Sequence, residues 1–95
     1  MLYTFRYSPF CSDLNALLRY MQPEDCLLLI EDGVLAGLKE TVSLKALLSS
    51  SGSVFALQED IEARGLTRQF ATDISRISYA DFVKLTIEHP QHIAW

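Results

Sequence analysis

The sequence predicts an α/β domain: a three-layer sandwich in which helices flank a mostly parallel sheet of four to five strands. Residues 26–30 are all apolar, without alternation, and turn-forming residues bound them. Such a run is typical of a strand buried on both faces, as in a parallel sheet covered by helices on each side. Strand-like and helix-like segments alternate along 95 residues, the length of a single domain, 1–95.

Apolar runs that end at turn-forming residues predict the strands. The strands are expected at residues 2–7, 26–30, 54–57, 74–77 and 93–95. The segment 74–77 is the weakest of these, and residues 49–53, a serine-rich stretch, are expected to form a tight connection into the third strand.

Helical periodicity and capping residues predict the helices between these strands. The first helix starts at Ser12 or Asp13, because leucines at helical spacing follow, and Pro23 ends it. A last helix opens at Ser78, whose partner in a near capping box is Asp81. Pro90 ends this last helix. Two short helical pieces are expected within residues 33–48, and a further helix is expected at residues 58–64, with Gly65 just after its end.

Composition narrows the class of protein. The chain is 49% hydrophobic and has a mean hydropathy of +0.15, which is high for a domain with so much surface per volume. We therefore expect some apolar surface to be covered by other subunits of an oligomer. The formal net charge of −4 argues against direct nucleic acid binding, which needs a basic face.

Cysteine usage and the absence of targeting signals predict a cytoplasmic, reduced protein. The sequence contains no run of about 18 apolar residues, so no transmembrane helix is expected. The first residues lack the pattern of a signal peptide. The two cysteines are 15 positions apart without a CxxC motif, which fits neither a disulfide framework nor a zinc site.

The end of the buried strand is the first place to look for chemistry. Glu31, Asp32 and Gly33 follow it, and ligands of parallel sheets bind just past the carboxyl ends of the strands. Adjacent carboxylates tend to point apart, so a turn and helix cap is the favoured interpretation of this segment. Asp60 is similarly interpreted as a charge at a helix start.

Neither cysteine has the features of an activated thiol. Cys11 lies in the loop between the first strand and the first helix, where a thiolate is favoured, but Asp13 opposes it and no basic residue stands in the loop. An ordinary loop cysteine is therefore the favoured interpretation of Cys11, and a reactive thiol is the alternative. Cys26, at the amino end of the buried strand, is predicted to be a small core residue.

The other candidate groups carry no complete motif. His89 and His92 flank Pro90, but no third metal ligand is near in sequence, so they are interpreted as solvated terminal histidines. No phosphate-binding glycine loop or nucleophile elbow is present. The residues alone therefore predict no catalytic group, no cofactor and no metal.

Several blocks of the chain resemble one family. The blocks are residues 1–10, 28–34, 54–66 and 79–86 together with Ala94 and Trp95, in the same order and at similar spacing. Together they are similar to the TusB family, the DsrH-type subunits of the TusBCD sulfur-relay complex. This resemblance implies the fold of the DsrE/DsrF/DsrH-like proteins over nearly the whole chain.

The resemblance also implies a function. Such a subunit belongs to a dimer of heterotrimers, with TusC-like and TusD-like subunits, that relays persulfide sulfur through a TusE-like carrier for 2-thiolation of the tRNA wobble uridine. The active cysteine belongs to the D subunit, so the chain is expected to be a non-catalytic structural subunit. Some DsrH-type subunits carry a cysteine in the first helix, but residues 14–18 here contain none.

Two alternatives stay open at this stage. One is a sulfurtransferase in its own right that uses Cys11 as its persulfide carrier. The other is a small-molecule binding module at the strand-end crevice near Glu31, Asp32 and Gly33, although no phosphate loop supports it.

The last helix and the terminal segment predict the subunit contacts. Apolar residues in the last helix cover more than one stripe, so one stripe is expected to pack on the sheet and another to meet a partner. We expect Phe82, Leu85, Ile93 and Trp95 to contribute to these contacts.

Overall fold

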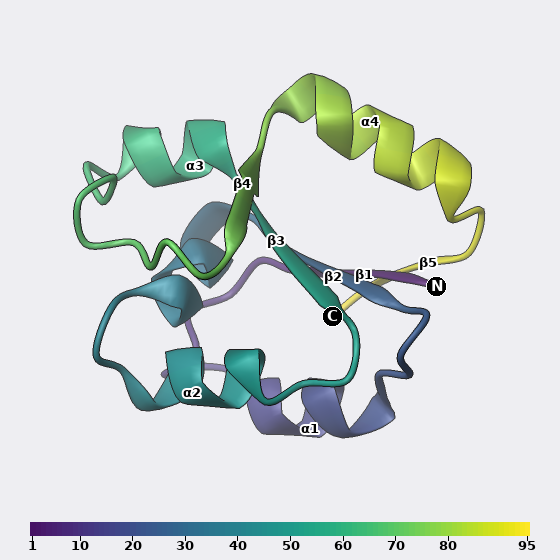
Figure 1. The fold of residues 1–95 in the computed structure, drawn as a ribbon, viewed down its shortest axis with the longest axis horizontal. Helices are drawn as coiled ribbons and strands as arrows, with labels where there is room; N and C mark the ends of the chain where they lie inside the picture. The colour runs from purple at the N-terminus through teal and green to yellow at the C-terminus, as the bar shows by residue number, and fades with distance from the viewer.

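The computed structural model describes residues 1–95 and arranges them around one five-stranded sheet (Figure 1). The strands are β1 (Leu2–Phe5), β2 (Cys26–Leu29), β3 (Ser53–Leu57), β4 (Ser75–Ile77) and β5 (His92–Ala94). The helices are α1 (Leu14–Tyr20), the 3-10 helix η1 (Glu31–Gly37), α2 (Val42–Leu48), α3 (Gln58–Ala63) and α4 (Tyr79–Glu88). The strand order is β4-β3-β2-β1-β5, and every neighbouring pair is parallel.

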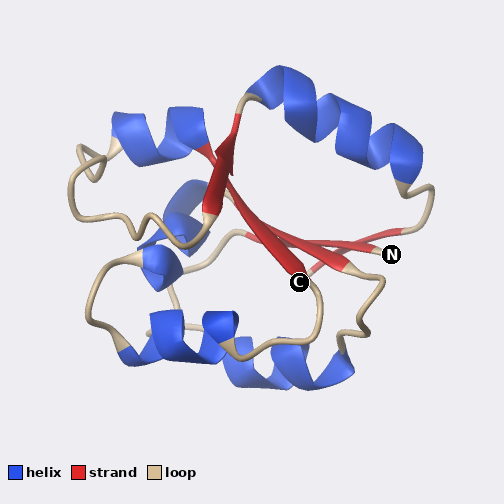
Figure 2. Ribbon diagram, in the orientation of Figure 1, coloured by secondary structure: helices blue, strands red, loops and turns tan.

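Helices lie on both faces of the sheet (Figure 2). In Figure 1, α1 and α2 pack below the sheet, whereas α4 crosses above it and returns the chain from the β4 edge to the β5 edge. α3 follows β3 without a gap and packs against η1 at the carboxyl end of the sheet. The predicted three-layer α/β sandwich is confirmed, with all five strands parallel.

The central strands β1 and β2 are buried along their whole length. They pair in register from Leu2 opposite Cys26 to Phe5 opposite Leu29. The uninterrupted apolar run of β2 is explained by this position, since both of its faces meet helices. The first strand is shorter than predicted and ends at Phe5, because the following Arg6 is already exposed to solvent.

The two faces of the sheet are covered unequally. Fourteen buried apolar residues form the main core on the α1–α2 side, and they include Leu27 and Leu29 of β2. The alternate positions of the central strands point to the α4 side, where the buried cluster contains only Leu2, Cys26 and Leu28. No residue of α4 is fully buried. The α4 layer is therefore the more weakly packed of the two.

The segment after β2 differs from the prediction. A turn at residues 31–33 followed by a short helix is expected, but one 3-10 helix, η1, begins directly at Glu31. Glu31 has the left-handed φ of 50°, which turns the chain sharply at the strand end. The N–H of Gly33 then donates to the carbonyl of Ile30 at 2.8 Å. A Cβ atom at Gly33 would overlap the carbonyl oxygen of Phe5, so only glycine fits beside β1.

Side-chain caps fix the helix starts. Asp13 Oδ1 accepts the N–H of Ala16 at 3.0 Å, which confirms the predicted start of α1. Ser78 Oγ accepts the N–H of Asp81 at 3.2 Å and starts α4. The return half of the predicted capping box is not made, because the Asp81 carboxylate instead lies 3.9 Å from Lys84 Nζ.

The remaining boundaries agree with the prediction to within a few residues. Residues 49–52 form a short turn into β3, Gly65 has a left-handed φ of 64° just past α3, and the weak fourth strand is β4. The chain ends in β5, which starts one residue earlier than predicted and pairs with β1.

A buried carboxylate ties the amino end of the sheet together. Asp25 is 6% exposed, and its Oδ2 accepts the N–H of Gln22 at 2.9 Å while its Oδ1 accepts from the Met1 ammonium at 3.1 Å. These bonds, first the one from the Gln22 backbone, hold the pKa of Asp25 below its ordinary value despite burial. No local sequence pattern predicts the contact with Met1, because the two residues are 24 positions apart.

The helices are all too short to cross a lipid bilayer, and none combines the required length with an apolar sequence.

Two glycine substitutions separate steric exclusion from backbone strain. We expect Gly33→Ala to destabilise the fold by about 3 kcal/mol or more, because the added methyl group overlaps the Phe5 carbonyl. Gly65→Ala has open space around its Cβ and a left-handed φ, so it should cost only about 1 kcal/mol. Urea unfolding of both variants measures the difference, and equal costs would contradict this account of Gly33.

The Asp25 carboxylate predicts a pH-dependent stability. Its folded-state pKa is lowered from 3.8, so the stability it contributes is present above about pH 5 and is lost as the pH falls through the folded-state value. Asp25→Asn should lower the free energy of unfolding by about 1–2 kcal/mol at pH 7. The difference between variant and wild type should shrink below about pH 4; a difference independent of pH would refute the role of the charge.

Candidate functional site

The carboxylates at the end of β2 are engaged in structural contacts. The N–H of Glu31 donates to Asp60 Oδ2 at 2.6 Å, so Asp60 caps η1 rather than facing a ligand. Asp32 Oδ1 lies 3.0 Å from Nε of Arg64, and Glu31 Oε2 lies 3.5 Å from Nε of Arg6. Glu31 and Asp32 thus point to cations on different elements, one after β1 and one after α3. The interpretation as a turn and cap agrees with this geometry, and the two groups do not form a catalytic pair.

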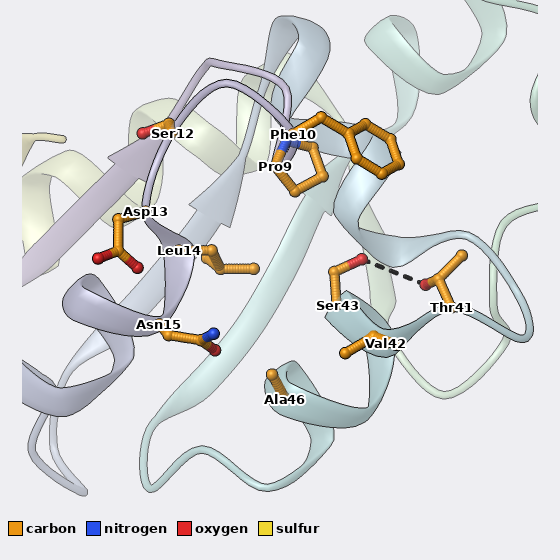
Figure 3. Close-up of a pocket in the computed structure, with 10 residues that line it drawn as sticks. All are labelled: Pro9, Phe10, Ser12, Asp13, Leu14, Asn15, Thr41, Val42, Ser43 and Ala46. Atoms are coloured by element: carbon orange, nitrogen blue, oxygen red, sulfur yellow. Dashed lines mark hydrogen bonds between the residues drawn. The ribbon is translucent and has the colours of Figure 1, made fainter.

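The main cavity lies elsewhere, between the loop after β1 and the first turn of α2 (Figure 3). Its volume is about 440 Å³. Its polar groups are largely occupied: Asp13 caps α1, and Thr41 Oγ1 caps α2 and lies 3.2 Å from Ser43 Oγ. The lining contains no histidine, cysteine, lysine or arginine, so it holds no phosphate-binding cation, and its one ionisable side chain is the Asp13 carboxylate that caps α1. Phe10 and Val42 border it, and they are 90% and 83% exposed.

Cys11 lies in the exposed turn after β1, close in sequence to this cavity but not in its lining. Its backbone N–H donates to the carbonyl of Ser8 at 2.9 Å. Its thiol makes no hydrogen bond and faces no imidazole that would take its proton. The structure therefore gives Cys11 access to solvent without the partners that activate a thiol.

Cys26 is buried, as predicted, but it has a partner that sequence reasoning missed. Its Sγ lies 3.3 Å from Nε2 of His89, which follows α4. Burial raises the pKa of the Cys26 thiol, so the thiol stays protonated near neutral pH. The contact joins the end of α4 to the start of β2 on the face of the sheet that α4 covers. No local signal links these residues, which are 63 positions apart.

His92 also contacts the sheet, through Nε2, which lies 3.1 Å from Oγ1 of the buried Thr4. The prediction of solvated histidines is confirmed for His92, which is exposed, whereas His89 is half-buried. Each imidazole also contacts a side chain of a central strand. His89 and His92 bind separate partners, on β2 and β1, and share no ligand position. They act as side-chain ties between the α4–β5 segment and the sheet.

The four residues predicted to make subunit contacts fall into two groups. Phe82 and Leu85 are half-buried on the inner side of α4 and pack on the cluster of Leu2, Cys26 and Leu28. Part of each side chain stays uncovered.

Ile93 and Trp95 lie at the β5 edge. Ile93 is 40% exposed, and the half-buried Trp95 packs its ring 5.8 Å from that of Tyr20, which is itself 66% exposed. These aromatic rings leave apolar surface open at the end of the sheet formed by β5.

Comparison with known sequences agrees with the resemblance. The family model described as DsrH like protein matches residues 7–92. The chain is 50% identical to Protein TusB of Yersinia pestis (strain Pestoides F) and of Yersinia pseudotuberculosis serotype O:1b (strain IP 31758), over 95 residues and the full length of both partners.

Solved structures share the fold at low sequence identity. Protein Tm0979 from Thermotoga maritima, a solution NMR structure, has a TM-score of 0.71 and 24% identity, covering 96% of this chain and 97% of its own. The crystal structure of the ychN protein from E. coli has a TM-score of 0.75 and 17% identity, covering 99% and 97%. These similarities support the parallel α/β architecture. On the family match and the full-length identity to curated relatives, the chain belongs to the DsrH-like family.

Proposed function

We propose that this chain is a non-catalytic structural subunit of a TusBCD-like heterohexamer, which relays persulfide sulfur for 2-thiolation of the tRNA wobble uridine. The observation that carries the proposal is the state of its thiols within a chain that is 50% identical to Protein TusB along its whole length. Cys26 is buried and protonated, and Cys11 has no activating partner. A persulfide carrier needs a thiol that is both accessible and activated by a neighbouring group, and neither cysteine combines the two features.

Surface composition supports a place in an obligate complex. Nine large apolar residues are exposed in a chain of 95 residues. Three of them lie on α4, two border the cavity of Figure 3 and one lies on β5, and the rest follow β1 or end α1 and α2. A subunit that meets more than one neighbour needs such surface on more than one side.

The expected partners are TusC-like and TusD-like subunits, called sibling subunits below, and a TusE-like carrier that reaches the chain only through the complex. Phe82, Leu85, Ile93 and Trp95 are proposed to contribute to the sibling contacts. The net charge of −4 makes direct contact with tRNA unfavourable for this subunit alone.

Native mass spectrometry tests the proposed assembly. The tagged chain, co-expressed with its sibling subunits, should give a hexamer with two copies of each of three small chains. Trp95→Ala should reduce the fraction of hexamer, because it removes the ring that borders the β5 edge. A wild-type chain that stays monomeric or forms only homo-oligomers would exclude the proposed role.

The alternative, persulfide transfer through Cys11, is testable on the intact protein. In that reaction the Cys11 thiolate would attack the terminal sulfur of a donor persulfide, taking that sulfur and releasing the donor thiolate. We instead expect Cys11 to react with iodoacetamide at the rate of an ordinary exposed thiol, and Cys26 to react far more slowly because it is buried.

The matched variants are Cys11→Ser and Cys26→Ser, measured in cells by the 2-thiouridine content of tRNA. Cys11→Ser should keep full thiolation. Cys26→Ser removes the thiol that contacts His89, so it shows how far a change in the fold alone affects thiolation. Loss of thiolation in Cys11→Ser, with assembly intact, would decide for the sulfurtransferase alternative.

A further inference from the structure

Helix α4 has a second apolar stripe that no part of the chain covers. Its inner residues Phe82 and Leu85 face the sheet, whereas Tyr79, Val83 and Ile87 recur at intervals of four on another side of the helix. These three side chains are 59%, 45% and 74% exposed. Helices on the surface of a monomer usually carry polar residues at such positions, so this stripe is unusual.

The surroundings of the stripe are acidic. α3 and α4 together carry five carboxylates, Glu59, Asp60, Glu62, Asp81 and Glu88, against the single cation Lys84. The two helices lie on the same side of the structure in Figure 1, and Glu59 Oε2 accepts the N–H of Tyr79 at 3.1 Å. The Glu59 carboxylate of α3 therefore stands next to the first residue of the stripe.

The helices on the other face have the opposite charge. α1 and α2 contain Arg19 and Lys45 and no carboxylate. Within the α-helices themselves the carboxylates therefore lie on α3 and α4, whereas Asp13 caps α1 and Arg64 directly follows α3. An apolar stripe in an acidic setting fits a partner that is apolar with a basic rim.

We propose that Tyr79, Val83 and Ile87, with the neighbouring carboxylates, form a docking face for a sibling subunit whose contacting surface is apolar and bordered by lysine and arginine residues. This inference rests on the proposed function, since it names the chemistry of one partner in that complex. It places the contact on the outer stripe of α4, whereas Phe82 and Leu85 mainly hold α4 to the sheet.

A second copy of the chain is a poorer occupant of this face. A two-fold symmetric contact would bring the same acidic patch of two copies together, and like charges across an interface oppose association. Nucleic acid is disfavoured for the same reason, because its phosphates would meet carboxylates. The charge pattern therefore favours a different, basic chain.

The test compares matched double variants in binding to the purified sibling subunits. Val83→Ser with Ile87→Ser removes apolar groups from the stripe, and Val42→Ser with Leu48→Ser does the same on the α2 side, where these side chains are 83% and 50% exposed. We expect the α4 pair to raise the dissociation constant about tenfold or more. For the sibling subunit whose binding the α4 pair weakens, the α2 pair should change the dissociation constant by less than about twofold, because the α2 surface is left for a different neighbour.

Charge reversal supplies an independent arm that leaves the packing of the fold intact. Glu62→Lys with Glu88→Lys should weaken binding about fivefold at low salt, and the loss should fade at about 1 M salt. Glu24→Lys with Glu40→Lys changes the net charge equally at exposed positions outside α3 and α4, and should have a smaller effect. Circular dichroism and melting temperatures confirm that all variants fold.

Each outcome decides a different point. If wild type binds the siblings and both α4-side variants bind equally well, the docking face is wrong while the proposed function stands. If wild type forms no complex with the siblings, both proposals fail. If Val83→Ser with Ile87→Ser instead abolishes a homo-oligomer of the chain alone, the occupant is a second copy and the basic partner is refuted.

Discussion

The structure depends on the parallel pairing of β1 and β2 in the middle of the sheet. All eight residues of these strands are buried. β5 extends the sheet on the β1 side of this pair, and β3 and β4 extend it on the β2 side. The chain can leave the pair only by a sharp turn, which the left-handed Glu31 and the close approach of Gly33 to Phe5 provide. That turn uses the acidic side chains at the strand end as braces to Arg6 and Arg64. At the place where many parallel sheets bind their ligands, the carboxylates of this chain are therefore paired with arginines.

The two faces of the sheet differ in how much apolar surface the chain itself buries, and the less covered face suits the proposed role as a subunit. The α1–α2 face closes a core of fourteen residues by itself, whereas the α4 face buries three and leaves apolar stripes open. Two imidazole contacts, from His89 to Cys26 and from His92 to Thr4, supplement this thin packing. A face of this kind is stable enough to fold and gains more by being covered, which is typical of subunits in permanent complexes.

The sequence predicted those features of the fold that depend on residues close together in the chain. The apolar run of β2, the cap at Asp13 and the glycine after α3 each follow from neighbouring residues, and the structure has them. The contacts of Asp25, Cys26 and Thr4 were not predicted, because each joins segments that only the strand order brings together. The same limit applies to η1, whose 3-10 form is set by the contact of Gly33 with β1 and not by its apolar spacing. Sequence reasoning also placed Phe82 and Leu85 at an interface without resolving which stripe of α4 faces the sheet.

The pairing of β5 with β1 has a consequence for how the chain folds while it is being synthesised. Strands β1 to β4 are added to the sheet in sequence from β1 outward, but β5 is the last to be synthesised and returns to the first. Until α4 and β5 have emerged from the ribosome, the face that carries Leu2 and Leu28 has no helix over it, and the outer edge of β1 is unpaired. The nascent chain is therefore open to a chaperone, or to a partner already folded nearby, on the side where the finished subunit is least covered.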